Sequence, residues 1–400
     1  MNFFGQEASD MLKASELAIK SVKGARNSFC KFLSANDTGA TGGHQSGLLV
    51  SKSASGMMFQ EYLPSTGILK REVKITWPDG MVTTSRFTYY SSKRELRITS
   101  FGRNFNFLRP DQAGSLFVLT EQDWEDYSGF FLDTDAEIDE FMQVLGISPT
   151  QTNALINYIP VTEESHELEL KQLAEKMLRE NHAFPTTEQM SVEARVLRSR
   201  LFKEKILSWD NPDQQLINWT DEEFKLFRAV ENVEYGGFLR RGFDSVDDFT
   251  ALANRVLNRR KSRAGKSLEH HLAALFDENS LEYTAQARTE GKKVPDFIFP
   301  SKWKYHDMTF PADKLISLAA KTTCKDRWRQ VITEADRIPI HYLCTLQQGV
   351  SEAQMDEMQS ENVILVVPKP YISAYPKNKR DRIWTLKKFI DFVKEKEGIQ

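Results

Sequence analysis

The sequence is poor in cysteine and histidine and contains no long apolar run. Its three cysteines, Cys30, Cys324 and Cys344, show no CxxC spacing, and its seven histidines are scattered. These features argue against a zinc site or a disulfide framework and favour a reducing compartment. No apolar run approaches the roughly 20 residues of a membrane span, and the N-terminal stretch lacks the basic-then-apolar layout of a secretory signal. We therefore expect a cytoplasmic protein without a membrane partner.

Net charge is small, but charged residues are concentrated locally. The formal net charge of −3 argues by itself against a nucleic-acid-binding protein. Residues 255–266, RVLNRRKSRAGK, nevertheless contain no acid, and residues 93–103, KRELRITSFGR, contain one. The cations of these stretches are Arg255, Arg259, Arg260, Lys261, Arg263 and Lys266, and Lys93, Arg94, Arg97 and Arg103. Such segregation favours a local positive groove, although a solvated helix face explains either stretch taken alone.

The length of the chain and its changes of pattern predict two domains. At 400 residues the chain is long for one domain. Residues 1–162 are expected to be mostly β after an opening helix, with a hairpin at 67–90 around a Pro-Asp-Gly turn. Residues 163–192 are polar and charged, and we interpret them as a linker. Within 193–400, helices give way after Gly265 to strands alternating with helices, which is typical of an α/β sheet.

Four ionisable residues of the second domain are placed for phosphodiester hydrolysis. Asp296 begins an apolar run in VPDFIFP, Lys321 ends the next run, and Glu334 lies on an expected helix at 326–338. Neighbouring strands bring such positions to one sheet edge, where carboxylates hold Mg²⁺ and a lysine stabilises phosphate charge. Glu269, on the preceding expected helix, is a fourth candidate. Taken singly, each position is more often a turn or a solvated side chain.

The segment after Lys321 carries groups that can read bases. Lys325 and Arg327 match the acceptors of guanine, whereas the carboxylate of Asp326 matches the amino group of cytosine. A helix N-terminus capped by Asp326 is the alternative interpretation. The nearby sequence RAGKS is no nucleotide-binding loop, because that motif requires a glycine where Arg260 stands.

Three long stretches resemble the EcoRII-type (Type IIE) restriction endonucleases. They are LSANDTGATGGHQSGL at 33–48, GFDSVDDFTALANRVLNRRKSRAGKSLE at 242–269 and AAKTTCKDRWRQVITEADRI at 319–338. The resemblance implies an N-terminal, β-rich DNA-binding pseudobarrel and a C-terminal α/β domain with the PD-(D/E)xK nuclease fold. It further implies a Mg²⁺-dependent homodimer that cleaves double-stranded DNA. A cognate DNA methyltransferase is expected as a genetic partner, without a stable complex.

The resemblance also assigns roles to individual residues. Asp296, Lys321, Glu334 and Glu269 become the catalytic set, with Asp296 and Glu334 as metal ligands. Ala319 stands where the general nuclease pattern has an acid, and Glu334 is expected to replace that acid from the following helix. The implied DNA contacts of the catalytic domain are Lys325, Asp326, Arg327, Arg259, Arg260, Lys261, Arg263, Lys266 and Tyr305.

Two further sites are implied by the same resemblance. Trp219 and Phe224 fall in the region of a pocket for extruded bases, although lone aromatics are more often core residues. The effector-DNA surface of the first domain would contain His44, Lys93, Arg94, Glu95 and Arg97. A flexible surface loop is the alternative interpretation of the glycine-rich segment around His44.

The function implied is cleavage of both DNA strands at a short CC(W/N)GG-like site. The N-terminal domain would bind a second copy of that site as effector and would autoinhibit the catalytic domain. Two other functions are compatible with the residues. One is a DNA-binding regulator that keeps an inactive nuclease fold, and the other is a modification-dependent or repair endonuclease.

Overall fold

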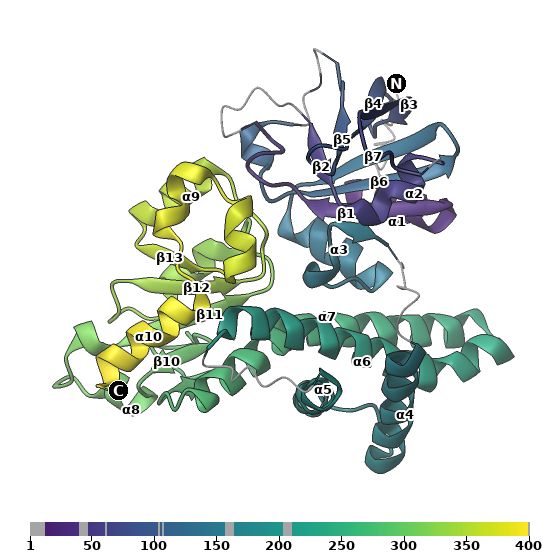
Figure 1. Cartoon of the computed structure of the whole chain (residues 1–400). Coiled ribbons are helices and arrows are strands. Elements are labelled where there is room, and N and C mark those ends of the chain that lie inside the picture. Colours follow the sequence, from purple (N-terminus) through teal and green to yellow (C-terminus); the bar gives the residue numbers. More distant parts are fainter. Residues whose placement is uncertain are drawn as a thin grey trace, which may run out of the picture.

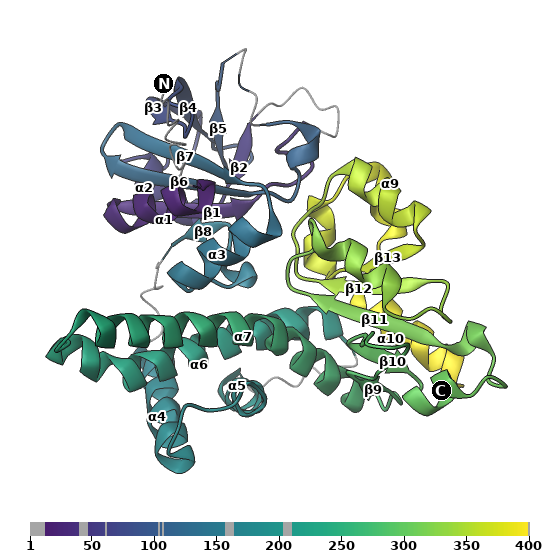
Figure 2. The ribbon, with the colours of Figure 1, turned by 180° about the vertical axis from the view of Figure 1, so that it is seen from behind.

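The computed structural model describes residues 13–39, 47–60, 62–102, 105, 108–156, 164–202 and 210–398. It contains one β-sheet in each half of the chain and a layer of long helices beside them (Figure 1). Helix α3 (Asp135–Leu145) lies between the N-terminal sheet and the long helix α7 (Val246–Glu278), as the view from behind shows (Figure 2). No helix among the described residues has the length and apolarity needed to cross a bilayer.

A curled sheet of eight strands forms the N-terminal half, in the order β2-β5-β4-β3-β7-β6-β1-β8. Its strands are β1 (Asn27–Phe32), β2 (Leu48–Val50), β3 (Ile68–Thr76), β4 (Val82–Tyr90), β5 (Glu95–Thr99), β6 (Leu116–Asp123), β7 (Asp126–Leu132) and β8 (Ala154–Leu155). Neighbours are antiparallel except β3 and β7. The predicted hairpin is confirmed: β3 and β4 pair along their whole length, and Gly80 supplies the positive φ of 81° that the turn requires.

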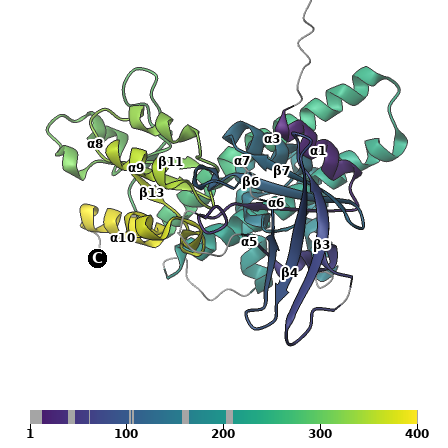
Figure 3. The same cartoon turned by 90° about the horizontal axis from the view of Figure 1, so that it is seen from above.

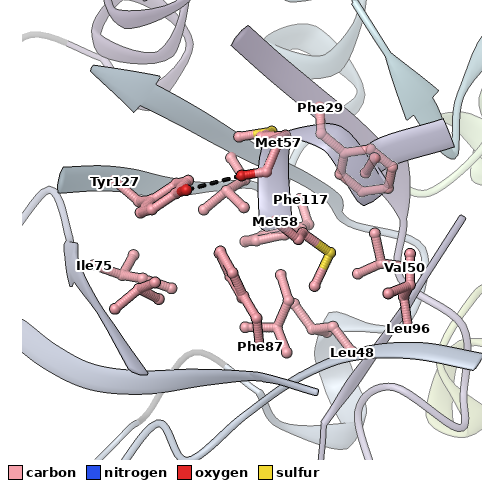
Figure 4. Close-up of a cluster of buried hydrophobic side chains, with 14 of the residues drawn as sticks. Phe29, Leu48, Val50, Met57, Met58, Ile75, Phe87, Leu96, Phe117 and Tyr127 are labelled. Carbon is pink, nitrogen blue, oxygen red and sulfur yellow. Dashed lines mark hydrogen bonds between the residues drawn. The ribbon is translucent and has the colours of Figure 1, made fainter. Parts of the chain in front are cut away.

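The curled sheet encloses its own core. The side chains of Phe29, Phe87 and Phe117 are fully buried inside it (Figure 4). The hydroxyl of Tyr127 donates to the carbonyl of Met57 at 2.8 Å and ties the short helix α2 (Ser55–Met58) to the sheet. Helices α1 (Ala14–Gly24) and α3 cover the outer face, mainly through apolar residues such as Phe141. Each buried phenylalanine contributes about 2 kcal/mol through the apolar surface that it removes from water.

Four helices link the two sheets. They are α4 (Glu164–Asn181), α5 (Thr187–Phe202), α6 (Pro212–Arg241) and α7. Helix α4 falls inside the predicted linker, yet its Leu170 and Met177 are buried against Leu226 and Phe227 of α6. The end at which α6 meets α7 projects away from both sheets (Figures 1 and 3). We expected separate helices before and after Gly265, but α7 runs through this residue, because a single glycine inside a helix costs only about 1 kcal/mol.

The C-terminal sheet has the order β13-β12-β11-β10-β9. Its strands are β9 (Thr284–Ala285), β10 (Phe297–Phe299), β11 (Ile316–Lys321), β12 (His341–Thr345) and β13 (Val363–Val366). Strands β11, β12 and β13 are parallel, whereas β10 is antiparallel to both of its neighbours. Helices α7, α8 (Lys302–His306), α9 (Glu352–Ser360) and α10 (Leu386–Glu397) accompany this sheet, so the expected α/β arrangement is confirmed.

The prediction of an α-helix at 326–338 is wrong. A 3₁₀ segment, η5 (Arg327–Thr333), stands there instead, and Glu334 is its final capping residue. The β-branched run Val331, Ile332 and Thr333 disfavours an α-helix, because these side chains lose rotamer freedom against the preceding turn. Pro339 then prevents any continuation.

Candidate active site

Asp296 and Lys321 meet at one edge of the C-terminal sheet. The antiparallel pairing of β10 with β11 sets Phe297 opposite Leu318, which brings the preceding Asp296 to the end of β11. The Oδ2 atom of Asp296 accepts the backbone N–H of Ala320 at 2.8 Å and lies 3.3 Å from Nζ of Lys321. Only 7% of Asp296 is exposed, so its carboxylate faces the interior of the site.

Glu334 joins this pair from the segment after η5. Burial raises the pKa of Glu334 to about 7, while the charge of Lys321 lowers this pKa and the charge of Asp296 raises it. Because the charges of Lys321 and Asp296 both act on this pKa, the Glu334 carboxyl lies near the other two groups predicted from the sequence. An acid with such a pKa changes its charge near neutral pH.

Glu269 reaches the same site through a residue that the sequence analysis missed. Nε2 of Gln286 donates to Oε2 of Glu269 at 2.9 Å and to Oδ1 of Asp296 at 2.8 Å. Lys266, one turn before Glu269 on α7, donates to that carboxylate at 2.7 Å. Because both carboxylates accept from one nitrogen, they border the same small space. Gln286 lies in a loop with a positive φ of 50°, and no recognisable motif marks it.

The donor atoms of this site suit a hard divalent cation. Asp296, Glu269 and Glu334 offer carboxylate oxygens, which Mg²⁺ prefers over nitrogen or sulfur. Among the residues that the structure describes, no three His, Cys, Asp or Glu side chains are grouped closely enough to hold a metal ion. In this arrangement both carboxylate oxygens of Asp296 and Oε2 of Glu269 accept hydrogen bonds from Gln286, Lys321, Lys266 and the backbone of Ala320.

The segment predicted to read bases is bound by helix α3 of the N-terminal half. The carboxylate of Asp135 accepts the backbone N–H groups of Lys325 at 3.1 Å, Asp326 at 2.6 Å and Arg327 at 3.1 Å. In return, Oδ2 of Asp326 accepts the backbone N–H of Asp135 at 3.0 Å. The start of α3 and the segment 325–327 therefore cap each other.

The cations of this segment are paired with acids of the N-terminal half. The buried Nζ of Lys325 donates to Oγ of Ser115 at 2.6 Å and lies 3.6 Å from Asp133. Burial lowers the pKa of Lys325, and the nearby acids, Asp133 foremost, oppose this shift. The guanidinium of Arg327 lies 2.8 Å from Asp139, on α3. Both cations that could meet DNA instead meet carboxylates of the same chain.

The basic stretch of α7 is largely engaged in contacts within the chain. Arg260 pairs with Glu231 at 2.7 Å and donates to the carbonyls of Gln143 and Val144 at the end of α3, each at 2.9 Å. Arg263 is buried and pairs with Glu223, and Arg259 lies over the ring of Phe184. Lys261 is exposed.

The aromatic residues singled out in the sequence are all buried. Trp219 packs in the core beneath the C-terminal sheet. Phe224 lines a cavity of about 40 Å³ between α3, α6 and α7, beside Arg228 and Arg260. Tyr305 is 2% exposed, and its hydroxyl donates to Glu290. This burial leaves Tyr305 no open path to a ligand in this conformation.

Of the predicted effector residues, Lys93 and Arg94 lie on the turn between β4 and β5, and Glu95 and Arg97 lie on β5. Lys93 and Arg94 are exposed there, and Arg94 has a positive φ of 53°. The buried Arg97 pairs with Glu95 at 3.0 Å. His44 lies outside the described residues.

Comparisons with known proteins agree along most of the chain. The family model of the N-terminal domain of restriction endonuclease EcoRII matches residues 21–148, and that of the EcoRII C terminal matches residues 227–390. The Type II restriction enzyme EcoRII of Escherichia coli is 40% identical over 387 residues, which span 90% of this chain and 92% of that protein. The Type II restriction enzyme SsoII of Shigella sonnei is 28% identical over 142 residues, or 31% of this chain and 46% of that protein.

Solved structures of restriction endonucleases are also similar to part of the chain. A metal-depleted Ecl18kI in complex with uncleaved, modified DNA has a TM-score of 0.45 and 23% identity, over 57% of this chain and 84% of that one. A PspGI–substrate DNA complex has a TM-score of 0.44 and 17% identity, over 54% of this chain and 93% of that one. With both family models matched in order and 40% identity along nine-tenths of its length, this chain belongs to the EcoRII family of Type II restriction endonucleases.

Proposed function

We propose that this site-specific deoxyribonuclease cleaves both strands of double-stranded DNA at a CC(W/N)GG-like site and depends on Mg²⁺. The meeting of Asp296 and Lys321 at one sheet edge, with Glu334 near enough for both charges to act on its pKa, supports the proposal. Asp296 and Glu334 would hold the ion, and Glu269 would assist. When bound, Mg²⁺ supplies a Lewis acid that lowers the pKa of a coordinated water.

The residues of the candidate site have separate roles in the proposed hydrolysis. The ammonium group of Lys321, held 3.3 Å from Asp296, is placed to stabilise negative charge on the scissile phosphate. Glu334 must lose its proton before it can serve as an anionic ligand, and its pKa of about 7 makes this loss possible near neutral pH. Gln286 keeps the carboxylates of Glu269 and Asp296 directed at the same space.

The experiment that tests this function compares the parent with Asp296→Asn. We expect the parent to cut unmodified plasmid DNA in the presence of Mg²⁺ and the variant to lose at least about 10³-fold in single-turnover rate, since a metal ligand is removed. DNA binding without metal should change less than about twofold. A parent that binds DNA but never cuts it would instead favour the inactive regulator, and cleavage of modified DNA alone would favour the modification-dependent enzyme.

The N-terminal domain is proposed to hold the catalytic domain in an inactive state. The side chains of Lys325 and Arg327 pair with Asp133 and Asp139, and the carboxylate of Asp326 accepts the backbone N–H of Asp135. DNA and these acids therefore compete for one segment. A second copy of the recognition site, bound at Lys93, Arg94, Glu95, Arg97 and His44, would favour the separated state. Such coupling requires two conformations with different affinities for DNA.

Cleavage of both strands calls for two active sites, and we propose a homodimer with two-fold symmetry. Lys261 and Lys266 would contact the DNA backbone, and Arg260 would join them once its bonds to the end of α3 are released. Arg259 and Arg263, which contact Phe184 and Glu223 of the same half, would need a further rearrangement to reach DNA. Trp219 and Phe224 remain the candidates for a pocket that takes an extruded base; Phe224 lines the small cavity, which would have to widen, whereas Trp219 is a core residue. A cognate methyltransferase would protect the host genome at the same site.

A further inference from the structure

Glu334 lies on a stretch of irregular backbone. Segment η5 ends at Thr333, and the next strand, β12, begins at His341. The direction of the Glu334 carboxylate therefore depends on contacts made by side chains from elsewhere in the chain. Those contacts come from the loop at 286–295, which joins β9 to β10.

Three side chains of this loop hold the backbone around Glu334. Oγ1 of Thr289 donates to the carbonyl oxygen of Glu334 at 2.6 Å. Oε2 of Glu290 accepts the backbone N–H of Asp336 at 3.3 Å, and Lys293 forms an ion pair with the carboxylate of Asp336. Thr289 is 7% exposed, so water competes little for its hydrogen bond.

The buried Tyr305 extends the same network. Its hydroxyl donates to Oε1 of Glu290, and its oxygen accepts the backbone N–H of Arg337 at 3.3 Å. The guanidinium of Arg337 donates to the carbonyls of Tyr305, Asp307 and Phe310. The backbone from Glu334 to Arg337 is thus held at both ends.

The same loop also holds Asp296. The backbone N–H of Gln286 donates to the carbonyl of Asp296 at 2.9 Å, and its side chain donates to Oδ1 of Asp296 at 2.8 Å. The start of the loop therefore binds the carboxylate of Asp296, and its middle binds the segment that carries Glu334. The loop sets the spacing between Asp296 and Glu334.

We propose that Thr289 and Glu290 are positioning residues that fix the Glu334 carboxylate relative to Asp296. The inference rests on the proposed role of Glu334 as a metal-holding group. Active sites tolerate little displacement: an error of 1 Å in the placement of a group can cost on the order of 100-fold in rate. Neither residue needs to touch DNA or metal for this effect.

The test compares Thr289→Val with Thr289→Ser in the full-length protein. Valine keeps the shape and removes the hydroxyl, whereas serine keeps the hydroxyl. Thr309→Val is the matched control. Among the residues that the structure describes, the Thr309 hydroxyl donates only to the side chain of Asp307, and both residues lie outside the loop. The measurements are Mn²⁺ binding by loss of the free-ion EPR signal, DNA binding without metal, and single-turnover cleavage at saturating Mg²⁺.

We expect Thr289→Val to weaken Mn²⁺ binding several-fold and to slow cleavage by roughly 10- to 100-fold, with DNA binding within twofold of the parent. Thr289→Ser and Thr309→Val should stay within about threefold of the parent in all three measurements. Parent-like Mn²⁺ binding and cleavage by Thr289→Val would overturn the inference, as would an equal loss in Thr289→Ser.

Two additional variants keep the test decisive. If Thr289→Val does not fold, Glu290→Gln, which loses one of two acceptors, must show the same loss of Mn²⁺ binding and rate, and parent-like values would overturn the inference. Glu334→Gln separates this inference from the proposed function. If Glu334→Gln cleaves like the parent, the role of Glu334 is wrong; if it is inactive while Thr289→Val is unaffected, only the positioning role fails.

Discussion

At the scale of single residues, Glu334 is a member of the candidate active site whose pKa is strongly shifted from that of a free side chain. Its pKa rises from 4.5 to about 7, chiefly through burial. The folded protein therefore binds this proton more tightly than the unfolded chain does. Between these two pKa values stability falls as pH rises, because the unfolded state ionises first. Above about pH 7 the folded protein bears the full free-energy cost of ionising Glu334 in its buried position.

This shift predicts a pH-dependent effect of Glu334→Gln on stability in the presence of EDTA. Near pH 4.5 the variant and the parent should differ little, since the carboxyl is largely protonated in the folded parent. At pH 8 the variant should be the more stable by at least about 1 kcal/mol, a value that allows for partial exposure of the group. Urea denaturation at both pH values measures the difference. Glu361→Gln, at an exposed position, serves as the control. A stability difference between Glu334→Gln and the parent that does not change with pH would contradict the raised pKa of Glu334.

The residues of the site were only partly predictable from the sequence. Asp296 and Lys321 mark the ends of apolar runs, and adjacent strands necessarily bring such ends together. Gln286 carried no signal, because its role depends on one loop conformation with positive φ. The sequence could not reveal the partners of Lys325 and Arg327 either, since Asp135 lies 190 or more positions away from them.

At the scale of elements, the proposed autoinhibition rests on the contact between α3 and the segment 325–327. One carboxylate, Asp135, satisfies three consecutive N–H groups, and Asp326 caps the start of α3 in return. Hydrogen bonds to a charged group contribute about 1.5–3 kcal/mol each. Hydrogen bonds to DNA or water can replace these bonds when α3 and the segment 325–327 separate. The net preference for the arrangement in which the two are bound, here called the closed arrangement, is therefore smaller than the sum of the bonds.

Asp135→Ala should therefore release the closed arrangement. We expect cleavage of DNA with a single recognition site to rise roughly tenfold, which corresponds to a loss of about 1.4 kcal/mol in the closed state. Asp126→Ala removes an exposed carboxylate elsewhere in the N-terminal domain and should leave this rate unchanged. A parent-like rate for Asp135→Ala, with a normal melting temperature, would argue against the contact as a restraint.

The elements themselves were predicted unevenly. The β3–β4 hairpin and strands β10 to β13 follow clear apolar patterns and were found where expected. The segment after Lys321 was not, because amphipathic spacing alone does not reveal that β-branched residues and Pro339 prevent a full α-helix. The predicted boundaries at 163 and 192 stay predictions, although α4 packs on α6 within them.

At the scale of the whole molecule, we propose the projecting end of α6 and α7 as the contact surface of the proposed homodimer. Leu239 is 66% exposed, Val246 78% and Phe249 51%. Arg240 and Arg241 end α6, and Asp247 and Asp248 begin α7, so the charges complement each other under a two-fold axis. Two such ends packed together would bury the apolar side chains in a four-helix contact.

The double variant Val246→Asp and Phe249→Asp should shift the protein from dimer to monomer in sedimentation velocity at micromolar concentration. Two buried carboxylates without partners make the contact unfavourable. Plasmid cleavage should then yield more nicked intermediate, because each active site acts alone. Val196→Asp, at an exposed position of helix α5, is the control. An unchanged dimer would mean that the copies meet through another surface.

The most direct test of the account is the activity of the catalytic half without the N-terminal domain. The fragment 164–400 is the appropriate choice, because α4 and α5 share a buried cluster with α6. If α3 restrains the segment 325–327, this fragment will cut single-site DNA at least about tenfold faster than the full-length protein, which a preference of about 1.4 kcal/mol would produce. A folded fragment that cuts such DNA no faster than the full chain would contradict the account.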